Sequence, residues 1–250
     1  VKYIKDYTDI PIVLINSTYQ KNNDEMAACV KLFDLIYVRE TLSKDDLSKY
    51  NIKSKVVPDM TFYSQFNLSK KSPTEDIGAS DSVYVEISKK IFELCKEKEY
   101  KFLPALTVSK KIRLNGFKNI IKFVKYNIYK NIKYILHQLR FRLVHEVDAK
   151  PYYMDNYQNY IQEISSLKFL IAGRYHSLCF SLKTLTPFVA IKSNSHKIEG
   201  MLEDVGIGID RVISEDDLNQ FRVNNFNKVE TDKILKYINE APLKIEAMFK

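Results

Sequence analysis

Residues 167–192 have the sequence LKFLIAGRYHSLCFSLKTLTPFVAIK, and this stretch decides the fold class. Two short apolar runs, 169–172 and 188–191, flank a segment with the length and pattern of a helix. Runs that are apolar throughout are typical of parallel strands buried on both faces, and parallel neighbours need a crossover that is usually helical. The stretch therefore predicts a strand–helix–strand unit of a doubly wound α/β sheet.

The same alternation extends along the rest of the chain. Toward the N-terminus we expect strands at 10–15, 34–40 and 55–59, with helices at 24–33 and 42–51. Asp81 is expected to cap a helix over 82–98, whose apolar face would hold Val85, Ile91, Phe92 and Leu94. Strands are then expected at 100–106 and 210–214, and helices at 156–166, 195–206 and 214–221.

The polar segment 67–80 contains Pro and Gly and is predicted to be a linker between two α/β halves. We place the N-terminal half at 1–75 and the second half at 76–230. Residues 231–250 are predicted to form a C-terminal helix, kinked or broken at Pro242.

Composition limits the class of protein. The chain has 250 residues, 45% hydrophobic and 28% charged, which is typical of a globular protein. No stretch approaches the roughly 20 apolar residues of a membrane span, and no signal peptide opens the chain. The three cysteines are far apart, so their spacing indicates neither a disulfide framework nor a zinc site. We therefore expect a cytoplasmic protein without a bound metal.

An arginine and a histidine follow the strand at 169–172. Gly173 marks the end of this strand, and Arg174 and His176 lie on the turn into the next helix, where open parallel sheets bind ligands. Arginine offers a planar fork to a carboxylate or phosphate, and histidine exchanges a proton near neutral pH. The pair therefore predicts an anion site. The alternative is that Arg174 pairs with a nearby carboxylate and His176 is a satisfied buried histidine.

A second strand-to-helix turn follows at 191–200. Ser195 is the expected N-cap, and Lys197 lies in the first turn, where a cation opposes the helix dipole unless an anion is bound. Asn194 and Ser195 would then be phosphate ligands. We assign no role to His137, His145 or His196.

Two earlier strand ends add Arg39 and Asp59 to the candidate site. For Arg39 the alternative is an ion pair that ties the strand end to the following helix. For Asp59 it is a helix-capping or structural role.

Three blocks of the sequence resemble the polysaccharide pyruvyl transferase family. Residues 170–207 contain R-x-H-S, then T-L-T-P with an apolar strand, then Lys-Ile-x-Gly-Met before a short helix. Residues 11–62 contain VRETLS, a helix and a strand ending in VPD, and residues 81–94 are similar to the helix that opens the family's second half.

The resemblance implies two Rossmann-like halves in a GT-B-like arrangement. The N-terminal half is expected to be incomplete, because the family's upstream strands and glycine-rich loop precede the matching segment. The implied reaction transfers a pyruvyl group, as a ketal, from phosphoenolpyruvate to a sugar of a cell-envelope or capsular polysaccharide or its lipid-linked precursor. By resemblance, Arg174 would hold the carboxylate or phosphate of phosphoenolpyruvate and His176 would be the general acid, without a metal or other cofactor.

Residues 108–146 match nothing in the family core and are predicted to be a basic helical insertion. Eleven Lys and Arg and no acidic residue lie between Glu99 and Glu146, in a chain of net charge +8. Apolar residues recur there with helical spacing, which predicts an amphipathic helix and places residues 110–145 on an anionic membrane surface, at the inner face of the cell membrane. The alternative is that the apolar stripe packs on the protein's own core. No nucleic-acid-binding motif accompanies the charge, so we do not expect a nucleic-acid partner.

Two other functions stay open. A GT-B-type glycosyltransferase would use the same anion site for a nucleotide sugar. A non-catalytic fragment would bind an anion or a membrane without turnover.

Overall fold

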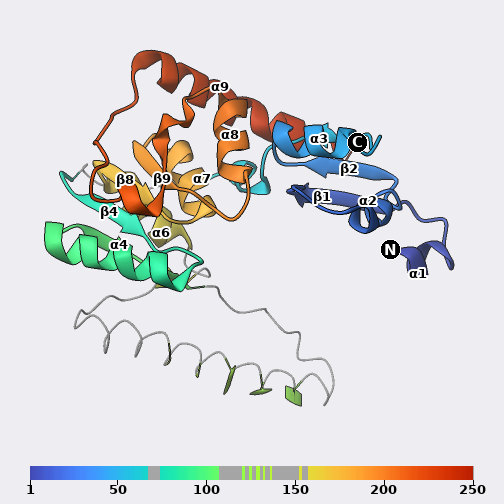
Figure 1. Ribbon diagram of the computed structural model, residues 1–250, viewed down its shortest axis with the longest axis horizontal. Helices are drawn as coiled ribbons and strands as arrows, with labels where there is room; N and C mark the ends of the chain where they lie inside the picture. Colours follow the sequence, from blue (N-terminus) through green and yellow to red (C-terminus); the bar gives the residue numbers. More distant parts are fainter. Residues whose placement is uncertain are drawn as a thin grey trace.

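The computed structural model describes residues 1–66, 74–106, 152–153 and 157–249, together with eight positions between 120 and 136. Within these residues the chain forms three parallel sheets with helices packed on them (Figure 1). The predicted α/β class with parallel strands is therefore confirmed. No helix among the described residues combines the length and the apolarity needed to cross a bilayer.

The larger sheet has five parallel strands in the order β10-β9-β8-β4-β5. Its strands are β4 (Ile77–Ser80), β5 (Lys101–Leu103), β8 (Phe169–Ala172), β9 (Phe188–Ile191) and β10 (Val212–Ile213). The chain runs outward from β4 to β5 and then returns to the other side of β4 to form β8. The strand order therefore reverses between β4 and β8, and the carboxyl ends of these two strands form the crevice where open α/β sheets bind ligands.

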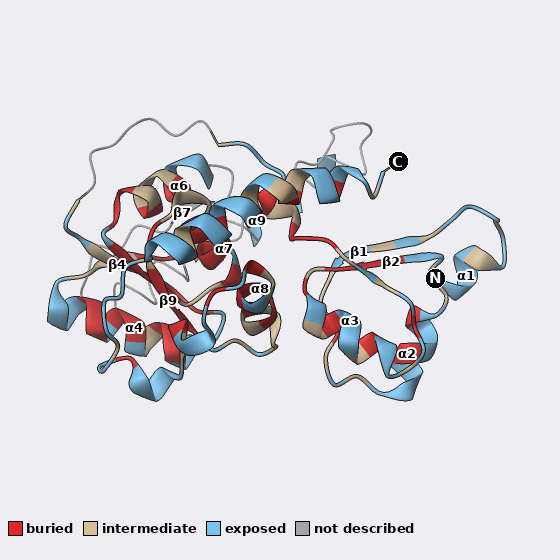
Figure 2. Ribbon diagram, turned by 90° about the horizontal axis from the view of Figure 1, so that it is seen from above, coloured by how far each residue is buried: buried red, intermediate tan, exposed pale blue. Residues whose placement is uncertain are grey.

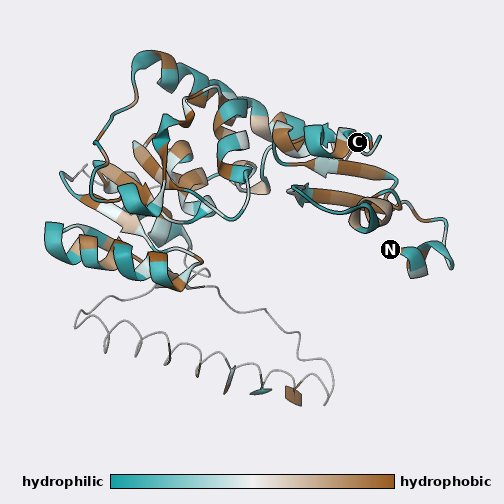
Figure 3. Ribbon diagram, viewed as in Figure 1, coloured by the Kyte–Doolittle hydropathy of each residue, from teal (hydrophilic) through white to brown (hydrophobic). Residues whose placement is uncertain are grey.

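Helices cover both faces of this sheet. Alternate residues of β8 point to opposite faces: Phe169 and Ile171 pack toward α4 (Val85–Lys98), whereas Leu170 and Ala172 belong to the core on the other face. That second core is built by α6 (Tyr157–Ser166), α7 (Tyr175–Thr184), α8 (Lys197–Val205) and α9 (Lys228–Glu246). Figure 2 shows these central strands as buried, and Figure 3 shows that they are hydrophobic. Each fully buried Phe, Leu or Ile contributes about 1.5–3 kcal/mol to this core.

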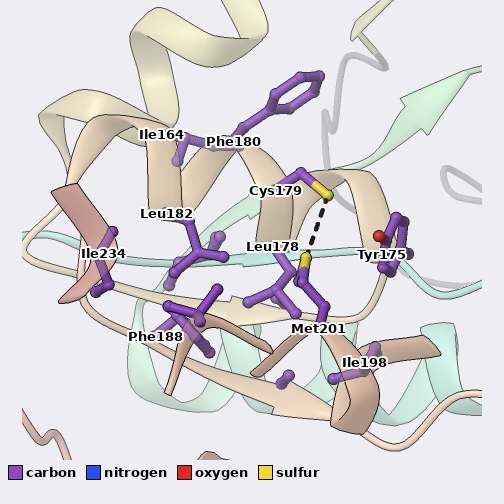
Figure 4. Packing of buried hydrophobic residues seen from close by; sticks show 14 of the residues in the cluster. Ile164, Tyr175, Leu178, Cys179, Phe180, Leu182, Phe188, Ile198, Met201 and Ile234 are labelled. Atoms are coloured by element: carbon purple, nitrogen blue, oxygen red, sulfur yellow. Dashed lines mark hydrogen bonds between the residues drawn. The ribbon is translucent and has the colours of Figure 1, made fainter. Parts of the chain in front are cut away.

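Close packing between α7 and α8 gives the candidate site a rigid base. Leu178 and Cys179 of α7 lie against Ile198 and Met201 of α8, and the Cys179 thiol contacts the Met201 sulfur at 3.9 Å (Figure 4). The first turns of the two helices are therefore held in fixed positions relative to each other.

A smaller parallel sheet precedes the larger one. It has the order β1-β2-β3, formed by β1 (Val13–Ser17), β2 (Leu35–Val38) and β3 (Lys55–Val56). The helices α2 (Asp24–Val30) and α3 (Thr41–Ser48) pack on it, and a short helix α1 (Lys2–Lys5) precedes it (Figure 1). The predicted strands and helices before residue 67 are thus confirmed, but their bounds differ: the strand predicted at 10–15 is displaced to Val13–Ser17, and the helix predicted at 42–51 spans Thr41–Ser48.

The helix α9 joins the two sheets. Its middle residues Ile234 and Tyr237 lie in the core of the larger sheet, whereas Ile245 packs against Tyr37 and Val57 of the smaller sheet. The 3-10 helix η1 (Met60–Phe62) contacts both α7 and α9 in the connection between the sheets. Further short elements are β6 (Ala105–Leu106), which pairs with β7 (Tyr152–Tyr153), and the 3-10 helices η3 (Ile209–Arg211) and η4 (Glu215–Asp217).

The prediction that residues 67–80 form a linker was wrong at its C-terminal end. Residues Ile77–Ser80 form β4, a central strand paired with both β5 and β8. The segment IGAS has a single β-branched residue and no aromatic one, so it lacks the run that marks a strand. A Cβ on Gly78 would lie 2.5 Å from Cδ1 of Leu167.

Three helix predictions also need correction. The helix predicted at 82–98 begins only at Val85, which is exposed rather than on the apolar face, and Asp81 does not cap it. The helix predicted at 214–221 is only the single turn η4. The C-terminal helix starts earlier, with a capping box between Asn227 and Glu230, and it continues through Pro242 without a break.

The predicted insertion at 108–146 lies mostly outside the described residues. The eight described positions within it are helical and exposed. This agrees with the predicted helix at those positions, whereas the rest of the segment stays a prediction.

Candidate active site

Two strand ends meet at the crevice of the larger sheet. The hydroxyl of Ser80, at the end of β4, accepts a hydrogen bond of 2.9 Å from the backbone N–H of Gly173, directly after β8. A Cβ on Gly173 would lie 2.7 Å from the backbone oxygen of Asp81 and 2.9 Å from that of Ser80. Only glycine lets these two backbone segments come this close, and the contact fixes the position of the next residue, Arg174.

Arg174 is held by a carboxylate. Its Nε and Nη2 atoms donate to the two oxygens of Asp81 at 2.6 and 2.5 Å. The Asp81 side chain is only 3% exposed, whereas 27% of the Arg174 side chain faces solvent. The alternative proposed for Arg174, pairing with a nearby carboxylate, is therefore confirmed. This pairing still leaves the Nη1 edge of the guanidinium free of any hydrogen bond within the described part of the chain.

His176 lies in the first turn of α7 and is exposed, so the alternative of a buried histidine is wrong. Partial desolvation lowers the pKa of its imidazole, and the cations Arg39, Lys197 and Arg174 lower it further, while the carboxylate of Asp59 acts in the opposite direction. His176 therefore lies in the field of three cations, Arg39, Lys197 and Arg174. A bound anion would therefore raise its pKa toward the neutral range.

Arg39 brings the smaller sheet into the site. Its Nη1 donates to Asp59 at 3.1 Å, and its Nε and Nη2 donate to the hydroxyl of Thr18 at 3.2 and 2.6 Å. The guanidinium carbon lies 4.8 Å from the ring centre of Tyr175, the first residue of α7. Residues of both sheets therefore meet at Tyr175. Arg39 does form an ion pair, but with Asp59 after β3, so the considered pair between the strand end and its following helix is not the one that forms.

Asp59 has the helix-capping and structural roles that were considered as the alternative for it. It caps η1 by accepting hydrogen bonds from the backbone and hydroxyl of Thr61, and its other oxygen pairs with Arg39. Burial alone would raise the pKa of this carboxyl, but the Thr61 hydrogen bonds, the charge of His176 and Arg39 together lower it. Asp59 therefore stays ionised beside His176.

Lys197 is a cation without an ion-pair partner among the described residues. It is the first residue of α8, and its Nζ lies 5.8 Å from the Tyr175 ring centre and 3.5 Å from Oδ1 of Asn194. Desolvation lowers its pKa, and the charge of Arg39 lowers it further. A cation in this position favours a bound anion, as the sequence suggested.

The expected N-cap of α8 was wrong. His196 occupies that position instead of Ser195, and no side chain caps the helix. His196, to which no role was assigned, is partly buried: its Nε2 lies 3.3 Å from the Ser43 hydroxyl and 3.7 Å from Glu40 of α3. Its backbone N–H donates to Gln20, so this turn connects the two sheets. Asn194 and Ser195 line a hollow of about 370 Å³ in this region, together with Gln20, Lys21, Lys192, Ser193, His196 and Glu199.

The site combines four groups that carry or accept positive charge with two carboxylates that are already engaged. The cationic groups are Arg39, Arg174, His176 and Lys197, and the carboxylates are Asp59 and Asp81. Such a balance suits a small ligand with more than one negative charge.

Sequence reasoning missed Asp81, Tyr175 and Thr18 as parts of this site. Asp81 directly follows β4, so detecting that strand would have placed the carboxylate at the same edge as Arg174.

The family model for polysaccharide pyruvyl transferase matches residues 1–195, well over half of the chain. This chain belongs to the polysaccharide pyruvyl transferase family. The family is a family of enzymes, and the matched range contains Arg39, Asp59, Asp81, Arg174 and His176. Lys197 lies just beyond it. No curated protein matches the chain.

Proposed function

We propose that the site around Tyr175 binds phosphoenolpyruvate and transfers its three-carbon unit, as a pyruvate ketal, to a sugar of a cell-envelope or capsular polysaccharide or its lipid-linked precursor. The observation that carries this proposal is the cluster of cations at the strand-order reversal, in a member of this family. Phosphoenolpyruvate carries a carboxylate and a phosphate, and both need positive partners.

Each cationic residue has a distinct task in this proposal. Arg174 offers its free edge to the carboxylate or phosphate of the donor, and Arg39 and Lys197 complete the field around it. His176, exposed and next to these cations, donates a proton to the methylene carbon or to the departing phosphate. Fixed charges of this kind stabilise the oxocarbenium-like centre that forms beside the two anionic groups.

The overall reaction balances without any further reagent. One sugar hydroxyl adds to C2 of phosphoenolpyruvate while C3 gains a proton from His176 and becomes a methyl group. The bond from C2 to the phosphate oxygen then breaks, and a second sugar hydroxyl takes its place. The two hydroxyl protons replace the one given by His176 and protonate the released phosphate.

Phosphate release from phosphoenolpyruvate, measured with mixed glycan acceptors, tests the proposal. Substitution of His176→Ala should lower kcat by about 10²–10⁴-fold. Arg174→Ala should also weaken donor binding. A matched control is Arg222→Ala, an exposed arginine between β10 and α9, which should behave as the wild type.

Two results would contradict the assignment. Phosphate release that persists in both His176→Ala and Arg174→Ala would exclude this site. Turnover of a nucleotide sugar instead of phosphoenolpyruvate would favour a GT-B-type glycosyltransferase.

We also propose that the basic segment 110–145 lies on an anionic membrane surface. Five described apolar residues recur there at steps of three and four and are exposed rather than packed on the core: Ile121, Val124, Ile128, Ile132 and Leu136. The lysines and arginines of the same segment have the charge that attracts anionic lipids, about 1 kcal/mol for each near the surface. This location suits an enzyme that modifies a lipid-linked glycan.

A further inference from the structure

The hydrogen bonds of Arg174 divide its guanidinium into a held side and an open side. A guanidinium has five N–H donors. Two of them donate to Asp81, one from Nε and one from Nη2, and no other acceptor contacts this side chain within the described residues. The open side includes both donors of Nη1.

Asp81 is itself fixed from several directions. Its Oδ1 accepts a third hydrogen bond, from the backbone N–H of Ala105 at 3.0 Å. The backbone around it is joined to the end of β8 by the bond between Ser80 and Gly173. The Asp81 carboxylate is thus held in place, and its two hydrogen bonds with Nε and Nη2 set the plane of the Arg174 fork.

A second buried arginine shows what a purely structural pair looks like. Arg211 forms the same two-bond contact with Glu230, at 3.1 Å for both bonds. Its remaining donors reach the carbonyls of Phe188, Asn224 and Asn225, so the whole guanidinium faces protein. Arg174 differs because its second edge is left open, at a strand end that faces the crevice.

We propose that Asp81 is a positioning residue that aims the open edge of Arg174 at the donor's anionic group. This inference rests on the proposed function, in which Arg174 binds phosphoenolpyruvate. Asp81 does not touch the donor. It holds the guanidinium plane before the donor arrives, which saves the entropy of ordering a long side chain on binding.

A double-mutant cycle on phosphoenolpyruvate binding tests this inference, with the dissociation constant measured by isothermal titration calorimetry on the full chain. Asp81→Asn puts an amide N–H against the Arg174 donors, so the guanidinium must rotate away. We expect the dissociation constant to rise about tenfold or more. In an Arg174→Lys background there is no fork to orient, so the same change should alter it less than about twofold.

Asp81→Glu gives a second variant in case Asp81→Asn does not fold. It keeps the charge but moves the carboxylate by one methylene, so it should also weaken binding and show the same dependence on Arg174. If Asp81 only neutralised charge in the site, Asp81→Glu would bind as the wild type and Asp81→Asn would bind more tightly.

Glu230→Gln is the matched control. It breaks the comparable pair at Arg211 and should lower the unfolding temperature without changing donor affinity. The inference would be overturned if folded Asp81→Asn had an unchanged dissociation constant. It would also be overturned if Asp81→Asn raised the dissociation constant by the same factor with Arg174 and with Lys at position 174. Both results would leave the proposed function intact. Failure of the wild type to bind phosphoenolpyruvate would instead overturn the proposed function.

Discussion

At the scale of single residues, His176 depends on its charged neighbours. Desolvation and the cations Arg39, Lys197 and Arg174 lower its pKa below the ordinary value of 6.5, and the carboxylate of Asp59 partly offsets them. The proposed acid is the protonated form. The value of kcat/KM for phosphoenolpyruvate should therefore fall about tenfold per pH unit above this lowered pKa.

Substitution of Asp59→Asn should move this falling limb to still lower pH, because the carboxylate that raises the pKa of His176 loses its charge. The measurement is a pair of pH profiles of kcat/KM. The ionisation of phosphoenolpyruvate affects both pH profiles equally. The difference between the two profiles therefore reflects ionisation of the enzyme. Coincident limbs would show that His176 does not supply the proton.

Gly173 gives a residue-scale test of the crevice itself. A methyl group there would meet backbone oxygens of Asp81 and Ser80, which cannot rotate away. Gly173→Ala should lower the free energy of unfolding by about 1–3 kcal/mol, measured by urea unfolding. Gly208→Ala is the matched control, since its Cβ would meet the end of the Asp210 side chain, which can move. Equal effects of the two changes would show that the β4–β8 contact is not tight.

At the scale of elements, the buried carboxylate of Glu40 lies where α3 packs against α8. It accepts hydrogen bonds from the backbone N–H and hydroxyl of Ser43 at 2.8 and 2.5 Å, and it is fully buried. Burial raises its pKa above 4.5, and this outweighs the opposing effects of Ser43 and His196. The stability linked to its neutral form is present below the unfolded pKa and is lost as the pH rises through the folded pKa.

Glu40→Gln should therefore unfold at a higher temperature than the wild type at pH 7, and this advantage should shrink as the pH falls toward 4.5. Thermal unfolding followed across this range measures it. Glu203→Gln, an exposed change on α8, should show no such trend. A pH-independent difference for Glu40→Gln would mean that hydrogen bonding, rather than ionisation, decides its effect.

The elements also show how far sequence reasoning reaches. Strands such as β8 and β9 could be predicted because they are continuous apolar runs, and Arg174 and His176 were placed correctly at the end of β8. The strand β4 could not be recognised, because its residues Gly78, Ala79 and Ser80 carry no strand signal. Because β4 was not predicted, Asp81 could not be placed at the end of a strand next to β8, and its pairing with Arg174 could not be predicted. The prediction that Ser195 caps α8 was wrong, because contacts with Gln20 and α3, which lie far away in the sequence, place His196 at that position.

At the scale of the whole molecule, the exposed apolar stripe of the basic segment predicts binding to membranes. The full chain should float with vesicles that contain anionic lipid and stay behind with neutral vesicles, and added salt should weaken the association. Deletion of residues 110–145 should abolish flotation. The double change Ile128→Lys with Ile132→Lys keeps every basic residue, adds two positive charges and removes two apolar side chains from the stripe, and it should also abolish flotation because apolar insertion is lost. Flotation of the deleted protein would contradict the proposal.

The position of α9 also determines which contacts form last during synthesis. Ile245, which covers Tyr37 and Val57, follows Val57 by 188 residues in the chain. This patch of the smaller sheet therefore stays uncovered while the ribosome completes the larger one, and contacts of such long sequence separation form late. A nascent chain that stalls before Ile245 leaves Tyr37 and Val57 of the smaller sheet exposed, and chaperones and proteases recognise exposed apolar residues of this kind.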